Sequence, residues 1–302
     1  MEFVTNFLTA DIRTATPLLL AALGLVFSER AGIVNIGTEG IMLIGALLGS
    51  VGAHVFAAPF MGALFAVLGG ALAGYVFAFF TVTLRGNQIV VGTAFNIFAL
   101  GLTTTLNRLL LAGVKSIPGY RTLAVPGLSR LPALGPILFR WSLPVYLAFL
   151  LAPLCWFALY KTNTGLKIRG VGEHPKASDT LGINVFRVRY GVLIFAGMMA
   201  GLAGSFVSMG QASTFIENMV AGKGFMAVAV CVFGNYSPLG VMLAALLFGA
   251  TDALKYRLLP VVGGGYSQFL NMLPYVITVL ALCVFAKRSN KPAASGVAYR
   301  KE

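Results

Sequence analysis

Residues Lys161–Arg189, KTNTGLKIRGVGEHPKASDTLGINVFRVR, form the one long polar interval in a chain that is otherwise mostly apolar. The interval carries six basic residues and two acidic ones. Pro175 to Leu181 is predicted to be a short helix, because proline is tolerated in a first helical turn and Gly182 stands where a C-terminal cap belongs. Between two apolar spans, such an interval is expected on the cytoplasmic side. An ordinary positively charged loop explains its charge equally well.

The composition of the whole chain is that of a membrane protein. Of its 302 residues, 58% are hydrophobic and only 10% are charged, whereas soluble domains carry roughly 25% charged residues. We therefore predict an all-α polytopic bundle of about eight to ten transmembrane helices, each of about 20 residues. The formal charge of +13 is assigned to cytoplasmic loops and lipid headgroups rather than to nucleic-acid binding.

The predicted organisation is a single membrane domain, 1–302, with a spanning core at 14–286 and a basic cytoplasmic tail at 287–302. Residues 1–13 lack a basic start, so an interfacial segment is predicted there rather than a signal peptide. The predicted spans are 14–27, 32–56, 59–84, 88–111, 143–160, 190–209, 239–256 and 268–286.

A further apolar run lies before the turn at Asn235–Pro238 and has barely eleven residues. If this run crosses the membrane, nine crossings place the 161–189 loop and the C-terminus inside and the N-terminus outside. If the run only re-enters, this arrangement fails.

The second predicted span begins with an unusual polar and glycine-rich stretch, GIVNIGTEGIMLIG at Gly32–Gly45. It places Asn35, Thr38 and Glu39 just inside the membrane. A carboxylate facing hydrocarbon costs about 2–3 kcal/mol, so Glu39 is expected to face protein or a water-filled cavity. The glycines permit a break in the helix, which exposes backbone groups. Either these side chains join neighbouring helices, or they contact a polar solute.

The fourth predicted span is also unusually polar. Asn96, Thr103 and Asn107 are spaced seven and four residues apart and therefore share a helix face. This face either lines a pathway or bonds to a neighbouring helix. Asp252 and Lys255, three residues apart, are predicted to form a local ion pair rather than a proton relay.

A faint internal repeat links the two halves of the chain. A glycine-rich half-run, a proline turn and an alanine-rich span occur at 32–74 and again at 224–253. In the predicted topology the two copies run in opposite directions, as they do in transporters built from inverted repeats.

Catalytic and metal-binding patterns are missing from the sequence. The cysteines, at 155, 231 and 283, lie in apolar runs without metal-ligand spacing, and His54 and His174 are far apart. The stretch GVGEHPKAS resembles a phosphate loop but has Pro175 where a glycine is needed. We therefore expect no metal, no cofactor and no enzymatic activity from this chain alone, and any ATP must be handled by a partner.

The run RGVGEHPKASDTLGINV resembles the cytoplasmic loop of the membrane subunits of binding-protein-dependent ABC importers. The resemblance is to the branch that imports nucleosides, simple sugars and branched-chain amino acids. It implies that the short helix docks into a groove of an ATPase subunit. Lys176 and Ser178 stand where that family commonly has acidic residues or alanine. The implied coupling residues are Glu173, Pro175, Ala177, Gly182 and Ile183.

The Gly32–Gly45 stretch and the runs GFMAVAVCVFGNYSPLG and FGATDALKYRL look most like the nucleoside-type permeases. That resemblance implies a complex with an ABC ATPase, a paralogous second permease and an extracytoplasmic binding protein, working by alternating access in the cell inner membrane. The expected function is import of nucleosides, with simple sugars as the alternative. The expected substrate-pathway residues are Asn35, Thr38, Glu39, Asn96, Thr103 and Asn107.

A rival from another class is an ion-coupled secondary transporter. Such proteins place ionisable groups in mid-membrane, where only Glu39 and Asp252 are candidates here. A channel is disfavoured because no filter motif is present.

The proline-rich loop at 112–142 is predicted to be exterior, where positive charge is unexpected. Its arginines at Arg121, Arg130 and Arg140 are explained if acidic lobes of a binding protein dock there.

Overall fold

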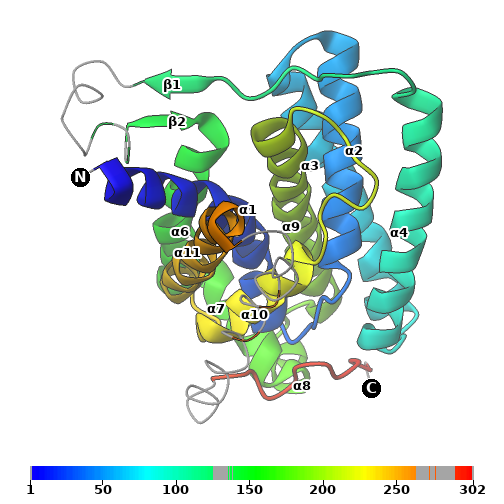
Figure 1. Ribbon diagram of the computed structural model, residues 1–302. Coiled ribbons are helices and arrows are strands. Elements are labelled where there is room, and N and C mark those ends of the chain that lie inside the picture. Colours follow the sequence, from blue (N-terminus) through cyan, green and yellow to red (C-terminus); the bar gives the residue numbers. More distant parts are fainter. Residues whose placement is uncertain are drawn as a thin grey trace.

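A computed structural model of the chain describes residues 2–124, 135, 137, 139–262, 272, 276 and 290–300. It is a bundle of helices with one small hairpin of strands (Figure 1). The elements are α1 (Glu2–Arg30), α2 (Thr38–Phe56), α3 (Pro59–Ala78), the π-helical η1 (Phe79–Thr83), α4 (Gln88–Leu110), β1 (Thr122–Ala124), β2 (Arg140–Ser142), α6 (Leu143–Lys161), α7 (Asn163–Glu173), α8 (Pro175–Thr180), α9 (Val185–Ser205), the π-helical η3 (Phe206–Ala212), α10 (Lys223–Phe233) and α11 (Pro238–Val262).

Seven helices of the described part are long and apolar enough to cross a membrane. They confirm seven of the predicted spans, and α3 with η1, α4 and α6 begin at the predicted residues. Of the predicted span at 268–286, the structure describes only Met272 and Val276, so this prediction is not tested.

The first span is longer than predicted. Residues 2–13, expected to form an interfacial segment, are part of α1. Their polar side chains fit a helix because the Thr9 hydroxyl donates to the Thr5 carbonyl, at 2.8 Å, one turn back. The sixth span also begins earlier, at Val185, where the Asn184 side chain caps α9 by accepting from the Arg187 amide at 2.9 Å.

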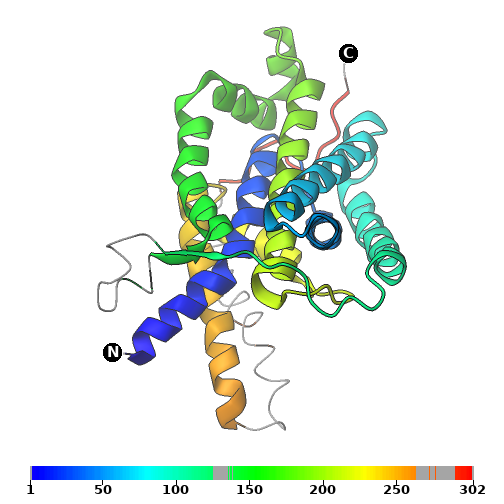
Figure 2. The ribbon, with the colours of Figure 1, turned by 90° about the horizontal axis from the view of Figure 1, so that it is seen from above.

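The centre of the bundle is held by glycines. A Cβ atom added at Gly45 would collide with the Gly201 backbone, and one added at Gly70 would collide with the Gly197 carbonyl. Helices α2 and α3 therefore approach α9 backbone to backbone, as small residues allow in membrane proteins. Figure 2 shows α3 and α4 on one side of α1 and α9, and α6 on the other.

The two ends of the bundle differ. Strands β1 and β2 pair antiparallel, with Thr122 opposite Ser142, at the end where the N-terminus lies. Helices α7 and α8 and residues 290–300 lie at the opposite end (Figure 1). Following the predicted orientation, we refer to these as the outer end and the inner end. The described parts of the 161–189 loop and of the tail thus lie at the same end, and their placement on the cytoplasmic side remains a prediction.

The tail is bonded to the inner end along its length. The Ala294 amide donates to the Gly172 carbonyl at 3.0 Å, and the Gly296 amide donates to the Gly32 carbonyl at 3.1 Å. Tyr299 is buried against α7 and α9. Residues 290–300 therefore join the end of α1 to the end of α7.

Helix α10 is too short to cross a membrane by itself. Its eleven residues span about 16 Å, against a hydrocarbon core of about 30 Å. The non-helical residues 213–222 complete the crossing. Ser213 accepts from the Ile117 amide at 2.9 Å in the outer loop, and Arg30 at the inner end donates to the Tyr236 carbonyl at 2.8 Å. Residues 213–236 therefore pass from the outer to the inner end as a broken span.

Candidate functional site

The candidate site lies inside the bundle, where α2 and α10 begin. Glu39 stands in the first turn of α2. Its Oε1 accepts a hydrogen bond from the Gly222 amide at 2.8 Å, and its Oε2 accepts one from the Gly224 amide at 2.6 Å. These amides are at the N-terminus of α10, which is the positive end of the helix dipole. The Glu39 carboxylate, at the start of α2, therefore accepts the free amide hydrogens at the start of α10.

The sequence Gly222-Lys223-Gly224 allows this close approach. Gly222 has φ +87°, which disfavours any residue with a side chain. A Cβ atom added at Gly224 would lie 2.5 Å from the Cα of Glu39. Sequence reasoning missed these residues, although a lysine between two glycines at the start of a short apolar run was a usable signal.

Asn96 joins α4 to the start of α2. Its Oδ1 accepts from the Gly40 amide at 2.8 Å, and its Nδ2 donates to the Ile36 carbonyl at 3.1 Å. Gln88, at the start of α4, accepts from the Val34 amide at 2.7 Å. Helix α4 thus supplies hydrogen bonds to Val34 and Ile36 in the non-helical segment 31–37. The polar face of α4 was predicted either to line a pathway or to bond to a neighbouring helix. Asn96 bonds to the neighbouring segment that leads into α2.

Asn35 and Thr38 lie beside Glu39 and are each 1% exposed. The Thr38 hydroxyl donates to the Asn35 carbonyl at 2.9 Å. The side-chain Oδ1 of Asn35 has no hydrogen-bond partner among the described residues. A buried acceptor left unpaired costs about 1–3 kcal/mol. Asn35 therefore offers an acceptor for which the described residues supply no donor.

Further charges surround the start of α10. Lys223 is half-buried and within electrostatic reach of Glu39 and Asp252. Lys255 Nζ lies 3.6 Å from Asp252 Oδ1, which confirms the predicted local ion pair. The site therefore contains both signs of charge.

The remaining predicted pathway residues lie elsewhere on α4. Thr103 and Asn107 follow Asn96 by seven and eleven residues, which places them about 10 and 16 Å further along the helix. Thr103 is buried, and its hydroxyl donates to the Ala99 carbonyl at 2.7 Å. Asn107 is half-buried toward the outer end. The structure therefore brings Asn35, Thr38, Glu39 and Asn96 together and leaves these two apart.

The predicted short helix of the 161–189 loop is confirmed as α8, Pro175–Thr180. Gly182 has φ +82° and its amide donates to the Asp179 carbonyl at 2.9 Å, as expected for the residue that ends a helix. Ala177 is exposed, and Leu181 is 81% exposed. Helix α8 therefore presents an uncovered surface in the described chain.

Two other coupling residues touch the rest of the inner end. Glu173 Oε2 accepts from the Ala293 amide of the tail at 3.2 Å. Ile183 is half-buried and packs against Val171, Val185 and Tyr299. Helix α7, which was not predicted, connects these contacts to α6.

At the outer end, Arg121 and Arg140 are exposed beside the β1–β2 pair, in which Arg140 stands opposite Ala124. Arg130 lies outside the described residues. The adjacent Tyr120 anchors this loop, since its hydroxyl lies 2.8 Å from that of Ser205. Burial raises the pKa of Tyr120 to about 12, so this phenol stays protonated at physiological pH.

Residues 8–285 match the family described as branched-chain amino acid transport system / permease component. The chain belongs to this family. It is therefore a multi-pass membrane protein and the permease component of an ABC-type importer.

Three named relatives are similar to this chain over most of their length. NupQ, a guanosine ABC transporter permease protein of Bacillus subtilis, is 40% identical, with 100% of this chain and 98% of NupQ covered. NupC, a nucleoside ABC transporter permease protein of Lactococcus lactis, is 39% identical, with 95% and 94% covered. TsgC13, a putative glucose ABC transporter permease protein of Haloferax volcanii, is 38% identical, with 85% and 79% covered.

One solved structure supports the fold. It is an inward-facing conformation of a putative metal-chelate type ABC transporter, with a TM-score of 0.52 and 15% identity, and it covers 93% of this chain and 85% of its own. At this identity the similarity concerns the fold alone.

Proposed function

We propose that this chain is the permease subunit of an ATP-driven nucleoside importer in the cell inner membrane. The observation that carries the proposal is the similarity, at 39–40% identity over nearly the whole chain, to permeases named for guanosine and nucleosides. The partners are an ABC ATPase, a paralogous second permease and an extracytoplasmic binding protein. ATP hydrolysis is assigned to the ATPase.

The substrate pathway in this proposal passes the start of α2. The unpaired Oδ1 of Asn35 accepts a hydrogen bond from a hydroxyl or amino group of the nucleoside. Glu39 and Asn96 shape the pathway by holding the two broken spans in place. Thr103 and Asn107 continue the polar face of α4 toward the outer end.

Coupling to ATP starts at α8 in the same proposal. The exposed α8 docks on the ATPase and moves with it. A Cβ atom at Gly172 would collide with the Arg30 carbonyl, so the end of α7 is in direct contact with the end of α1. Residues 31–37, which include Asn35, follow α1 at once and lead to Glu39. A displacement of α7 therefore reaches the substrate pathway through only a few residues.

The outer end receives the binding protein. The exposed guanidinium groups of Arg121 and Arg140 attract acidic lobes and orient them, which raises the association rate chiefly at low salt. Charge reversal at both positions is expected to weaken docking most at low ionic strength.

Simple sugars are the second candidate substrate, because TsgC13 is nearly as similar as the nucleoside permeases. An ion-coupled transporter is less favoured by the geometry. Both carboxylate oxygens of Glu39 already accept amide hydrogen bonds, which leaves this group poorly suited to bind and release a coupling ion.

Reconstitution in liposomes tests the proposal. We expect no uptake by the purified chain alone, and ATP-dependent uptake of labelled guanosine when the second permease, the ATPase and the binding protein are added. Excess glucose should not compete. Competition by glucose would favour the sugar alternative, and uptake by the lone chain under a proton or sodium gradient would replace the ABC mechanism by ion coupling.

A further inference from the structure

A cavity of about 410 Å³ opens between α7 and the inner half of α9, and none of its lining residues belongs to the site at Glu39. Its floor is apolar and is formed by Phe27, Ile168, Val192 and Phe195. The rings of Phe27 and Phe195 meet edge to face, with centroids 4.9 Å apart. A volume of this size suits a small ligand or part of a lipid.

The mouth of the cavity is basic. Lys167 of α7 and Arg187 of α9 line it, and both side chains are exposed. Neither forms an ion pair with a carboxylate of the described residues. Two cations that no described carboxylate neutralises thus stand next to an apolar floor.

The cavity runs from the membrane surface inward. Arg187 is the third residue of α9 and Phe195 follows eight residues later, about 12 Å deeper along the helix. Since α9 continues as a membrane span to Ala212, the charges lie near the headgroups and the floor lies in the hydrocarbon. This polarity is that of a phospholipid with an anionic headgroup.

We propose that this cavity binds an anionic phospholipid of the inner leaflet, with Lys167 and Arg187 on the headgroup and an acyl chain on the Phe27–Phe195 floor. A soluble partner could meet the two charges but could not reach the floor. Each basic group near an anionic headgroup contributes about a fivefold gain in binding.

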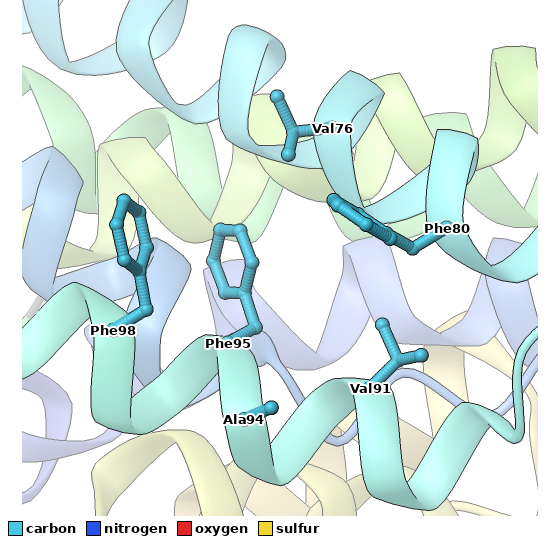
Figure 3. Close-up of a pocket in the computed structure, with 6 residues that line it drawn as sticks. All are labelled: Val76, Phe80, Val91, Ala94, Phe95 and Phe98. Carbon is cyan, nitrogen blue, oxygen red and sulfur yellow. The ribbon is translucent and has the colours of Figure 1, made fainter.

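A second cavity on the bundle has no basic residues and shows by comparison what Lys167 and Arg187 contribute to the first. It has a volume of about 330 Å³, lies between α4 and the α3–η1 segment, and is lined only by apolar residues (Figure 3). In Figure 3, Phe95 and Phe98 rise from α4 toward Val76 and Phe80, with no basic group among the lining residues. This cavity can take an acyl chain without selecting a headgroup.

The proposal is tested on the purified full chain by native mass spectrometry with added phosphatidylglycerol or phosphatidylcholine. We expect preferential retention of phosphatidylglycerol, weakened about 25-fold in the double variant Lys167→Gln/Arg187→Gln. The matched control is Lys161→Gln/Arg85→Gln, which removes two exposed charges outside the cavity and should keep the preference. Equal losses in both double variants would mean non-specific surface attraction and overturn the proposal.

A second variant fills the cavity and leaves the charges. A Cβ atom at Gly191, which lines the cavity, meets nothing within 4 Å, so Gly191→Leu should fold with an unchanged melting temperature. It should lose phosphatidylglycerol as the charge variant does. Undiminished binding in Gly191→Leu would overturn the cavity as the site. Weakened ATPase binding with unchanged phosphatidylglycerol binding in Lys167→Gln/Arg187→Gln would assign the two charges to the protein partner instead.

Discussion

The starts of α2 and α10 are built alike but completed differently. Each helix follows a non-helical segment, residues 31–37 and 213–222, and the two helices run in opposite directions between the ends of the bundle. The start of α10 receives a carboxylate, from Glu39, on two amides. The start of α2 receives a neutral amide, from Asn96. These two helix starts lie in the two copies of the repeat predicted at 32–74 and 224–253, which remains a prediction.

The chemical difference between the two acceptors predicts a difference in how firmly the two helix starts are held. A carboxylate at a helix N-terminus combines charge-assisted hydrogen bonds with the helix dipole, whereas an amide makes neutral bonds of about half that strength. The start of α10 is therefore expected to be the more firmly held of the two. The start of α2, with the unpaired Asn35 beside it, is expected to move during transport.

The largest effect is expected at the start of α10. Glu39→Ala leaves the Gly222 and Gly224 amides without their acceptor inside the bundle, which should lower the free energy of unfolding by about 3 kcal/mol. Glu39→Gln keeps one acceptor and should lose about half as much. Thermal unfolding in detergent measures both. The control Glu217→Ala breaks an exposed ion pair with Arg108 and should change stability little. A loss of stability in this control as large as that of Glu39→Ala would show that Glu39 does not specifically hold the start of α10.

The second-largest loss of stability is expected from adding a side chain at the start of α10. Gly224→Ala places a Cβ atom 2.5 Å from the Glu39 backbone and should destabilise the protein by about 2 kcal/mol. Gly101→Ala is the matched control, because a Cβ atom there meets nothing within 4 Å. It should be neutral or slightly stabilising, since alanine favours a helix. Equal melting temperatures for both variants would contradict the tight contact.

A smaller effect is expected at the start of α2. Asn96→Ala removes the bonds to Gly40 and Ile36, and should lower stability by about 1–2 kcal/mol because both bonds are neutral. Hydrogen exchange of residues 31–40 should accelerate, with little change at 222–226. Acceleration at 222–226 of the same size would show that the two helix starts open together.

The smallest effect on stability, and the one that separates a structural from a substrate role, is expected at Asn35. Asn35→Leu removes an unpaired buried acceptor, so unfolding stability should stay the same or rise by up to about 1 kcal/mol. Guanosine uptake by the reconstituted complex should nevertheless fall. Thr38→Val, which removes the bond to the Asn35 carbonyl, serves as the control for local packing. Normal guanosine uptake by Asn35→Leu would exclude a contact between Asn35 and the substrate.

Coupling at the inner end can be tested separately from the site. Gly182→Val forces a β-branched residue into φ +82°, which should loosen the end of α8 while leaving insertion intact. We expect slower transport with normal amounts of protein in the membrane, measured by uptake and by immunoblot. Normal transport would remove α8 from the coupling role.

The sequence alone determined the features that depend on neighbouring residues. Apolar runs predicted seven of the spans, Pro175 and Gly182 bounded α8, and the three-residue spacing predicted the Asp252–Lys255 pair. Local hydrophobicity, capping and helix periodicity suffice for such features, because each acts within one or two turns. They did not predict that residues 2–13 continue α1, because their mixed polar and apolar pattern fits a separate interfacial segment and a longer helix equally well.

Only the tertiary structure decided which distant groups meet. Glu39 is bonded to amides 183 and 185 residues away, Asn96 to backbone 56 and 60 residues away, and the tail to α1 and α7. The sequence required Glu39 to avoid hydrocarbon, since a buried charge needs partners. It could not name them, because the packing of glycine-lined helices, rather than any local preference, brought the two broken spans together.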